Sequence, residues 1–450
     1  MQTRLSTRWS RPRGFFSPRR QATPPVAILS GVLPSPKRKV RGKTLEFYEY
    51  YAGYSAEFVR ATLEHVGQPG SIVADPWNGA GTTTTVAVAK SFRAIGFDLN
   101  PVMVLVAKAA LLTQSVRPST LPLARDILKK AEKLRFLAPS EPLLRWFRPS
   151  AASAIRGIEL AIQEILVAEG HRGVVATHST LEGVSSLAAF YYTALFRVVR
   201  GLTNRYRASN PTWILPASRG LGTTEAELRQ LFEREIDRME GAIGATVTSQ
   251  PFQAQLDLSD SRALPLPDES VDIVLSSPPY CTRIDYAIAT LPELAVLHAS
   301  DENIRELRRA LIGSPTLSTI VAEPDSHWGQ ACLDFLASVQ AHPSKGSKGY
   351  YCKVFSTYFH YLYVSLTEIK RVMRRGGQVF LVVQDSHYKE LHNDLSAVVQ
   401  EMATALQFDL IERTDYPMTN PIRNINTRSR GYRTTTALTE SILHFEAPGT

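Results

Sequence analysis

The chain has 450 residues, of which 44% are hydrophobic and 21% are charged, as in an ordinary globular protein. No apolar stretch is long enough to span a bilayer, which argues against a membrane protein and predicts a cytoplasmic one. The three cysteines, Cys281, Cys332 and Cys352, lack the paired spacing of metal ligands, so we expect reduced thiols and no metal site.

The net charge of +9 is concentrated at the N-terminus. Residues 1–43 hold eleven of the 51 basic residues and no acidic residue, which leaves 40 basic and 42 acidic residues elsewhere. This pattern predicts a disordered basic tail over residues 1–43 that binds nucleic-acid phosphates. A solvated tail that only aids solubility is an alternative. A transit peptide is disfavoured because prolines interrupt the amphipathic helix it needs.

The first ordered elements predict a nucleoside site. Ser55 caps an expected helix over residues 56–66, and a strand over residues 71–75 runs into a glycine loop. A helix over residues 83–91 then points its amino end at the loop, and a strand over residues 93–98 ends in Asp98, 17 residues after Gly81. A strand, glycine loop, helix, strand and acid in this order are typical of nucleoside binding. A plain turn is the alternative.

A long helical block follows the expected helix at residues 102–112. Helices are expected at 123–137, 151–168, 181–200 and 224–243, so residues 115–245 are predicted to be an insertion and a candidate target-recognition region. Arginines alternate with aromatic and amide residues between these helices, and Arg200, Arg205 and Arg207 are candidate DNA contacts. A solvated basic helix end packed against the core is equally compatible.

The sheet resumes near residues 252–256, and a strand over residues 271–275 leads into Ser276-Ser277-Pro278-Pro279-Tyr280. Proline donates no ladder hydrogen bond and restricts the residue before it, so this stretch is a stiff elbow at a strand's carboxyl end, where α/β sheets place ligands. Its carbonyls suit an amino group, and its aromatic ring suits a base. The alternative is a strand that stops at prolines, with the tyrosine packed below.

The remainder completes an α/β architecture. We expect a helix at 283–298 and an irregular second insertion at 300–350 with a basic helix around 305–309. A helix at 354–374, ended by Gly376-Gly377, should precede a strand at 378–383, a helix at 391–406 and closing strands at 408–413 and 440–445. The catalytic domain would comprise residues 44–114 and 246–450. Three further arginines are candidate DNA contacts, namely Arg283, Arg428 and Arg430.

These motifs together resemble one family. The stretch Asp75-Pro76-Trp77-Asn78-Gly79-Ala80-Gly81-Thr82-Thr83 resembles the S-adenosylmethionine loop of amino-group DNA methyltransferases, although Phe-Cys-Gly-Ser-Gly is commoner there. Residues 95–101 resemble the ribose-binding strand. Residues 260–267 and Ser276–Tyr280 resemble the adenine-contacting and catalytic motifs, and Gly376-Gly377 precedes a strand similar to a further family strand. The resemblance covers about half the chain, and the insertions match nothing.

The resemblance implies a Rossmann-like class I methyltransferase sheet with S-adenosylmethionine as cofactor. Asp98 would bind the ribose, Asp260 the adenine amine, and the loop the methionine end, while Asp75 either orders the loop or contacts the cofactor. The implied cofactor contacts are Asp75, Trp77, Gly79, Gly81, Thr82, Asp98, Asn100, Asp260 and Ser276. The implied catalytic residues are Ser277, Pro278, Pro279 and Tyr280, of which Ser277 and the Pro278 carbonyl would accept hydrogen bonds from the amine.

The substrate implied by the resemblance is a flipped base of double-stranded DNA. Ser277 before Pro-Pro-Tyr resembles cytosine-N4 enzymes, whereas aspartate or asparagine there resembles adenine-N6 enzymes. Cytosine N4 is therefore favoured and adenine N6 is the alternative. A structured RNA substrate is less favoured, and a non-catalytic nucleic-acid-binding module is the alternative of another class. Nucleoid association is implied, while the recognition sequence, the oligomeric state and the choice between a cognate restriction endonuclease and none stay open.

Overall fold

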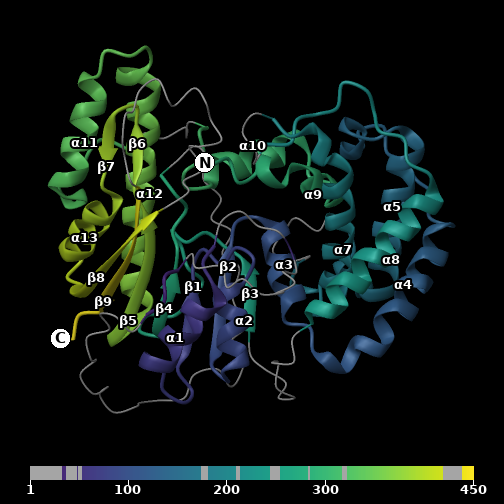
Figure 1. Ribbon diagram of the computed structural model, residues 1–450, viewed down its shortest axis with the longest axis horizontal. Coiled ribbons are helices and arrows are strands. Elements are labelled where there is room, and N and C mark those ends of the chain that lie inside the picture. The colour runs from purple at the N-terminus through teal and green to yellow at the C-terminus, as the bar shows by residue number, and fades with distance from the viewer. Residues whose placement is uncertain are drawn as a thin grey trace.

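The computed structural model describes residues 33–36, 48, 53–173, 181–208, 213–243, 254–281, 284–316, 322–418 and 438–449. These residues build a seven-stranded sheet in the order β3-β2-β1-β4-β5-β9-β8 (Figure 1). The first five strands in this order are parallel, and β9 runs antiparallel to both of its neighbours, β5 and β8. The predicted Rossmann-like α/β fold is confirmed. The strands are β1 (Ile72–Asp75), β2 (Arg93–Asp98), β3 (Ala254–Leu258), β4 (Val271–Ser276), β5 (Met373–Gln384), β8 (Asp409–Met418) and β9 (Leu438–Glu446).

The two central strands, β1 and β4, determine where the site lies. Every residue of β1 is buried, and β4 is buried except at Asp272, as expected of parallel strands covered on both faces. In the ladder, Ala74 pairs with Val274. Asp75 and Ser276, which end these strands, therefore lie at the same edge of the sheet.

Helices cover both faces of the sheet. They are α1 (Ala56–Val66), α2 (Thr82–Ala89), α3 (Pro101–Ala110), α11 (Gln330–Ala341), α12 (Cys352–Val372) and α13 (Leu395–Ala405). Two further helices, α9 (Leu291–Val296) and α10 (Asp301–Ala310), belong to the hydrophobic core that also contains α3. The bounds predicted for α1 are confirmed, because the Ser55 side chain accepts a hydrogen bond from the Phe58 N–H and so caps the first turn. None of the helices within the described residues has the length and apolar character needed to cross a bilayer.

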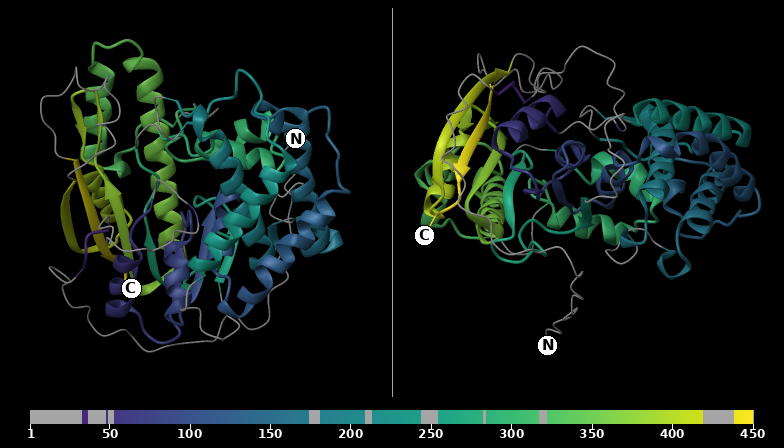
Figure 2. Two further views of the ribbon diagram at one scale, coloured as in Figure 1. Left: turned by 45° about the vertical axis from the view of Figure 1, so that its right-hand side comes forward. Right: turned by 90° about the horizontal axis from the view of Figure 1, so that it is seen from below.

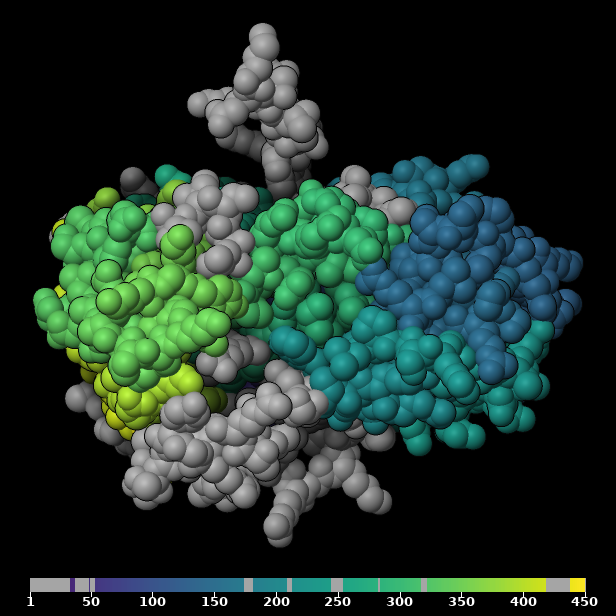
Figure 3. Space-filling model, turned by 90° about the horizontal axis from the view of Figure 1, so that it is seen from above, coloured from purple at the N-terminus to yellow at the C-terminus, as the bar shows by residue number. Residues whose placement is uncertain are grey.

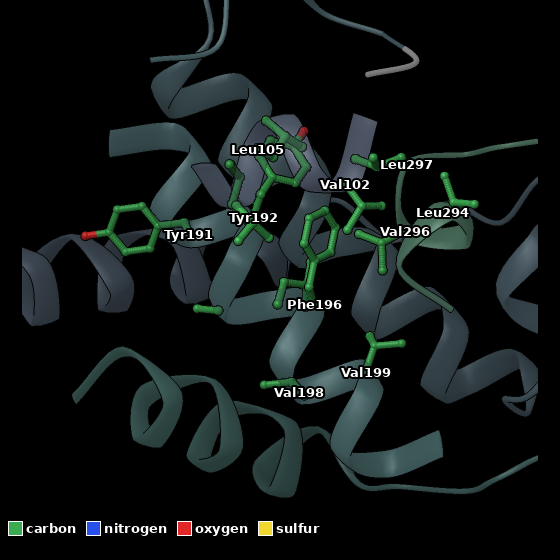
Figure 4. Close-up of a cluster of buried hydrophobic side chains, with 14 of the residues drawn as sticks. Val102, Leu105, Tyr191, Tyr192, Phe196, Val198, Val199, Leu294, Val296 and Leu297 are labelled. Carbon is green, nitrogen blue, oxygen red and sulfur yellow. The ribbon is translucent and has the colours of Figure 1, made fainter. Parts of the chain in front are cut away.

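Four further helices form what we call the helical region: α4 (Arg117–Ala131), α5 (Pro149–Leu166), α7 (Ser186–Thr203) and α8 (Glu225–Ala242). They lie together beyond α3, at the end of the molecule opposite β8 and β9 (Figures 1 and 2). One hydrophobic core joins them to α3 and α9, where Val102, Phe196 and Val296 meet (Figure 4). The same core includes Tyr280 and Tyr286, so it extends from the helical region to the elbow.

The second predicted insertion, residues 300–350, is more regular than expected. It contains α10 and also α11, which packs against α12 and α13. The segment of α9 and α10 lies between the helical region and α11–α12 on the face seen in Figure 3. α11 was missed because its breakers, Pro324, Pro343 and Gly346, flank an apolar helical pattern and do not interrupt it.

Several predicted helix boundaries are wrong. The helix expected at 123–137 is α4, which lies six residues earlier at Arg117–Ala131, and the helix expected at 181–200 is α7, which begins at Ser186. The helix expected at 391–406 begins at Leu395, because residues 391–393 form β7 (Leu391–Asn393), which pairs with β6 (Ser386–Tyr388). The helix expected at 283–298 is the short α9, preceded by a 3₁₀ turn (Ile288–Thr290). α12 ends at Val372 and not at the glycine pair, because the N–H groups of Glu269 and Ser270 bind its last carbonyls.

Candidate active site

A cavity with about 900 Å³ of open space lies at the carboxyl ends of β1, β2 and β4. Both predicted motifs contribute to its wall. The glycine loop and its neighbours supply Asp75, Trp77, Gly79, Thr82, Asp98 and Asn100, and the elbow supplies Ser277, Pro278, Pro279 and Tyr280. Of the predicted site residues, Gly81, Asp260 and Ser276 are not among those that line it. Two motifs that are far apart in the chain thus share one space.

The glycine loop adopts a conformation that only glycine takes readily. Gly79 has a φ of 49° and Gly81 a φ of 84°, both in the left-handed region. A Cβ at Gly81 would lie 2.7 Å from the Ala107 Cβ, so Gly81 permits α2 to pack closely on α3. Gly79 faces the cavity, where the missing side chain leaves the backbone accessible. The two glycines therefore have different tasks.

Asp98 braces the loop from the end of β2. Its carboxylate accepts hydrogen bonds from the Gly79 N–H at 3.0 Å and from the Asn100 N–H at 2.8 Å. Burial raises its pKa to about 6. Asn100 accepts from the Val102 N–H and so caps α3, and its side-chain amide donates to Thr290. Asn100 is 2% exposed, which favours a structural role over cofactor contact.

Asp75 is a buried connection between the loop and the elbow. Its carboxylate accepts from the Ser276 hydroxyl at 2.5 Å, the Tyr54 hydroxyl at 3.1 Å and the Trp77 N–H at 3.1 Å. Burial raises its pKa, and these hydrogen bonds oppose that increase. These contacts agree with the loop-ordering role predicted for Asp75, while its alternative role as a cofactor contact stays a prediction because Asp75 also lines the cavity. Ser276 is fully buried and its hydroxyl donates to Asp75, so its side chain forms an internal link and does not line the cavity; its cofactor contact stays a prediction.

Replacing Ser276 with alanine should lower the free energy of unfolding by about 1–3 kcal/mol, because the buried Asp75 carboxylate loses one of its donors. Urea denaturation measures this loss. Ser119→Ala, an exposed position on α4, is the control and should leave the midpoint nearly unchanged. Equal midpoints for the two variants would contradict the importance of the link.

The elbow is held by hydrogen bonds from three directions. The Ser277 hydroxyl donates to the Val382 carbonyl of β5 at 2.8 Å. The lone pairs of Ser277 Oγ therefore point away from Val382. Tyr358 donates to the Pro279 carbonyl at 2.9 Å, and the Tyr280 N–H donates to the Tyr286 hydroxyl at 3.3 Å. Tyr280 itself is 4% exposed, and burial raises the pKa of its phenol. A rigid loop with a small accessible aromatic face results.

Asp260 does not reach the cavity. Its carboxylate pairs with the Arg262 guanidinium, at 2.9 and 3.0 Å from Nε, and Arg262 lies over the Tyr361 ring at 3.8 Å. The adjacent Ser259 and Ser261 line the cavity instead. The prediction of Asp260 as an adenine contact thus identified the segment, but an ion pair occupies this carboxylate.

The predicted DNA contacts separate into three groups. Arg200 is an internal residue, because its guanidinium pairs with the fully buried Glu293 at 2.6 Å and contacts Tyr48. Burial of Glu293 without a cation would be costly, which explains this placement. Arg205 and Arg207 are exposed around the 3₁₀ turn Asn204–Tyr206 and stay predictions. Arg283, Arg428 and Arg430 lie outside the described residues, as does the tail apart from 33–36.

Sequence reasoning missed several residues that line the cavity, among them Tyr54, Tyr286, Leu311 and Ile312. The crowding of tyrosines at residues 48–54 was a visible signal for Tyr54, but nothing local linked it to the glycine loop. Leu311 and Ile312 follow α10 and reach the cavity through tertiary packing alone. Within the described ranges, no group of three or more His, Cys, Asp or Glu residues is arranged to hold a metal ion.

No protein-family profile matches the chain. Among solved structures, an S-adenosylmethionine-dependent methyltransferase from Methanosarcina mazei overlaps with a TM-score of 0.30 and 8% identity, covering 86% of this chain and 98% of that one. A putative DNA modification methylase from Thermus thermophilus, solved with S-adenosyl-L-methionine, overlaps with a TM-score of 0.19 and 21% identity, covering 27% and 54%. Overlaps this weak support no inference about function.

Curated sequences give local matches. The chain is 23% identical to the Type II methyltransferase M.AvaI of Nostoc sp. over 151 residues, which are 31% of each protein. It is 45% identical to the Type II methyltransferase M.BsoBI of Geobacillus stearothermophilus over 56 residues, 12% of this chain and 11% of the relative. The chain thus spans about a third or less of the length of these relatives. Over those stretches it is similar to Type II methyltransferases.

Proposed function

We propose that the protein is a DNA methyltransferase that transfers a methyl group from S-adenosylmethionine to the exocyclic amine of a base, with cytosine N4 as the favoured target. The observation that carries this proposal is the shared cavity, because the glycine loop with Asp98 and the elbow Ser277–Tyr280 line one space. A methyl donor and its acceptor must meet at such a junction. The local similarity to Type II methyltransferases supports the same reaction.

The residues present suit the cofactor. The Asp98 carboxylate at the end of β2 is placed to accept hydrogen bonds from ribose hydroxyls, and the Gly79 backbone is open to the cavity. Ser259 and Ser261, which line the cavity beside Asp260, are the proposed adenine contacts in its place. When bound, S-adenosylmethionine supplies a methyl group on a positively charged sulfur, which keeps the electron pair of the breaking C–S bond as the new C–N bond forms.

The elbow acts on the target amine, whose lone pair is delocalised into the ring of the base. The Ser277 proton is engaged by Val382, so Ser277 Oγ serves as a hydrogen-bond acceptor for the amine. The Pro278 carbonyl is the second acceptor. Together they orient the nitrogen and localise its lone pair toward the methyl group. Tyr280 contacts the face of a base that has left the duplex, and the product proton passes to solvent.

Methyl transfer is tested by incubating the protein with unmethylated duplex DNA of mixed sequence and isotopically labelled S-adenosylmethionine. The DNA is then digested to nucleosides for mass spectrometry. We expect labelled N4-methylcytosine. Label in N6-methyladenine alone would overturn the cytosine assignment, which depends on Ser277. Transfer to structured RNA but not to DNA would overturn the DNA assignment, and no transfer to either would overturn the enzymatic proposal.

A further inference from the structure

The peptide unit between Pro279 and Tyr280 is gripped at both ends by tyrosine side chains. Tyr358, from α12, donates its hydroxyl proton to the Pro279 carbonyl at 2.9 Å. Tyr286, six residues after Tyr280, accepts a hydrogen bond from the Tyr280 N–H at 3.3 Å. The carbonyl and the N–H belong to one rigid plane and point in opposite directions. The two hydrogen bonds therefore hold opposite edges of the same peptide plane.

The geometry explains why such a grip matters here. The proline rings restrict φ at Pro278 and Pro279, so the main freedom left in the elbow is rotation of the next peptide plane, through ψ of Pro279 and φ of Tyr280. Rotation of this plane would move the Pro279 carbonyl and redirect the Tyr280 ring. The following segment adds confinement, since a Cβ at Gly313 would lie 2.8 Å from the Tyr280 carbonyl.

Both tyrosines are buried, which makes their hydrogen bonds to the peptide plane costly to break. Tyr358 is 2% exposed and Tyr286 is 7% exposed. The phenol of Tyr358 stays protonated and able to donate, because burial raises its pKa well above the usual range. A buried carbonyl that loses its donor incurs a desolvation penalty, so the plane has a strong preference for its present orientation. Tyr286 also lines the cavity, whereas Tyr358 does not.

We propose that Tyr286 and Tyr358 are positioning residues, which form a clamp on the Pro279–Tyr280 peptide plane so that the Tyr280 ring faces the base and the Pro279 carbonyl is held away from the target amine. The inference rests on the proposed methyl transfer. Tyr358 engages the Pro279 carbonyl and so keeps it from competing with its neighbour for the amine. The clamp acts on the target half of the cavity and leaves the cofactor half, at Asp98, untouched.

The test is a double-mutant cycle with Tyr286→Phe and Tyr358→Phe. Each change removes one hydroxyl and keeps the ring, and single-turnover methyl transfer to unmethylated duplex DNA gives the rate. We expect each variant to slow transfer by about tenfold, with the dissociation constant for S-adenosylmethionine changed by less than about twofold. Because both hydroxyls hold one plane, the loss of either should already release it. The rate reduction in the double variant should therefore be much smaller than the product of the two single-variant reductions.

Tyr191→Phe is the matched control. Tyr191 is fully buried in α7 and donates to the Thr120 carbonyl at 2.7 Å, so its loss removes the same kind of hydrogen bond far from the elbow. This variant should transfer methyl groups at the wild-type rate despite a lower unfolding midpoint. Should Tyr358→Phe prove unstable, Tyr286→Phe alone still tests the clamp.

Two outcomes separate the clamp from the function on which it rests. Active wild-type protein with a Tyr358→Phe or Tyr286→Phe variant as fast as Tyr191→Phe would overturn the clamp and leave methyl transfer standing. Fully multiplicative effects in the double variant would also overturn it, because they would show two independent contacts. Wild-type protein that binds S-adenosylmethionine but transfers no methyl group would overturn the proposed function, and the clamp with it.

Discussion

Tyr280→Ala should reduce the rate of methyl transfer by about a hundredfold or more, while the affinity for S-adenosylmethionine changes by less than about threefold. Tyr280, Asp98 and Gly79 all line the cavity, and in the proposed function Tyr280 contacts the target base whereas Asp98 and Gly79 bind the cofactor. Without the ring, an extruded base has no aromatic face to stack on. Single-turnover kinetics and isothermal titration calorimetry measure the two effects separately.

Tyr280→Phe is the matched control, since it keeps the ring and removes only the hydroxyl. We expect its transfer rate to lie within about threefold of wild type if stacking is the principal role. Because Tyr280 is 4% exposed, the alanine variant also creates an internal cavity, so its unfolding midpoint must be recorded. Equal losses of rate and cofactor affinity in folded Tyr280→Ala would place Tyr280 at the cofactor and contradict this assignment.

Asp98→Asn should weaken S-adenosylmethionine binding by about tenfold to a hundredfold. Hydrogen bonds to a charged acceptor contribute about 1.5–3 kcal/mol each, and an amide also opposes one of the two N–H groups now bound to the carboxylate. Calorimetric titration measures the loss. Asp126→Asn, at an exposed position of α4, is the control and should bind the cofactor as wild type does.

The affinity should also depend on pH in a defined direction. The pKa of Asp98 is raised to about 6, so the carboxylate is charged at pH 7.5 and becomes protonated as the pH falls through 6. Protonation removes acceptor capacity, so we expect affinity to decline below pH 6 by up to about tenfold per unit. Asp98→Asn should abolish this decline. A pH profile unchanged in that variant would assign the titration to another group.

Sequence patterns predicted those parts of the fold that local signals determine. The bounds of α1 follow from the Ser55 cap and apolar residues at helical spacing, and β2 was predicted from Arg93 to Asp98. β6 and β7 were missed because they have three residues each, too few to show an alternating pattern. Gly376-Gly377 resembled a helix end but lies within β5, because the contact with Glu269 and Ser270 that ends α12 is tertiary.

In the candidate site, too, sequence patterns identified the local motifs but not the tertiary contacts that orient them. Gly79, Asp98 and the elbow lie in contiguous motifs, and the structure brings them into one cavity. The partners that orient them come from far along the chain: Tyr358 is 79 residues from Pro279, and Tyr54 is 221 residues from Leu275, whose carbonyl it contacts. Composition alone also does not distinguish an arginine that faces solvent from one that pairs with a buried glutamate, as Arg200 does.

The position of α3 makes the folding of the sheet and that of the helical region depend on each other. Eight of its ten residues are buried, and it packs between the sheet and α7. Excision of the helical region would expose an almost wholly apolar cylinder, which favours aggregation over a soluble remnant. We therefore expect the catalytic sheet and the helical region to unfold as a single cooperative unit, despite their separation along the sequence. The helical region would then be an obligatory part of the scaffold that carries the cavity.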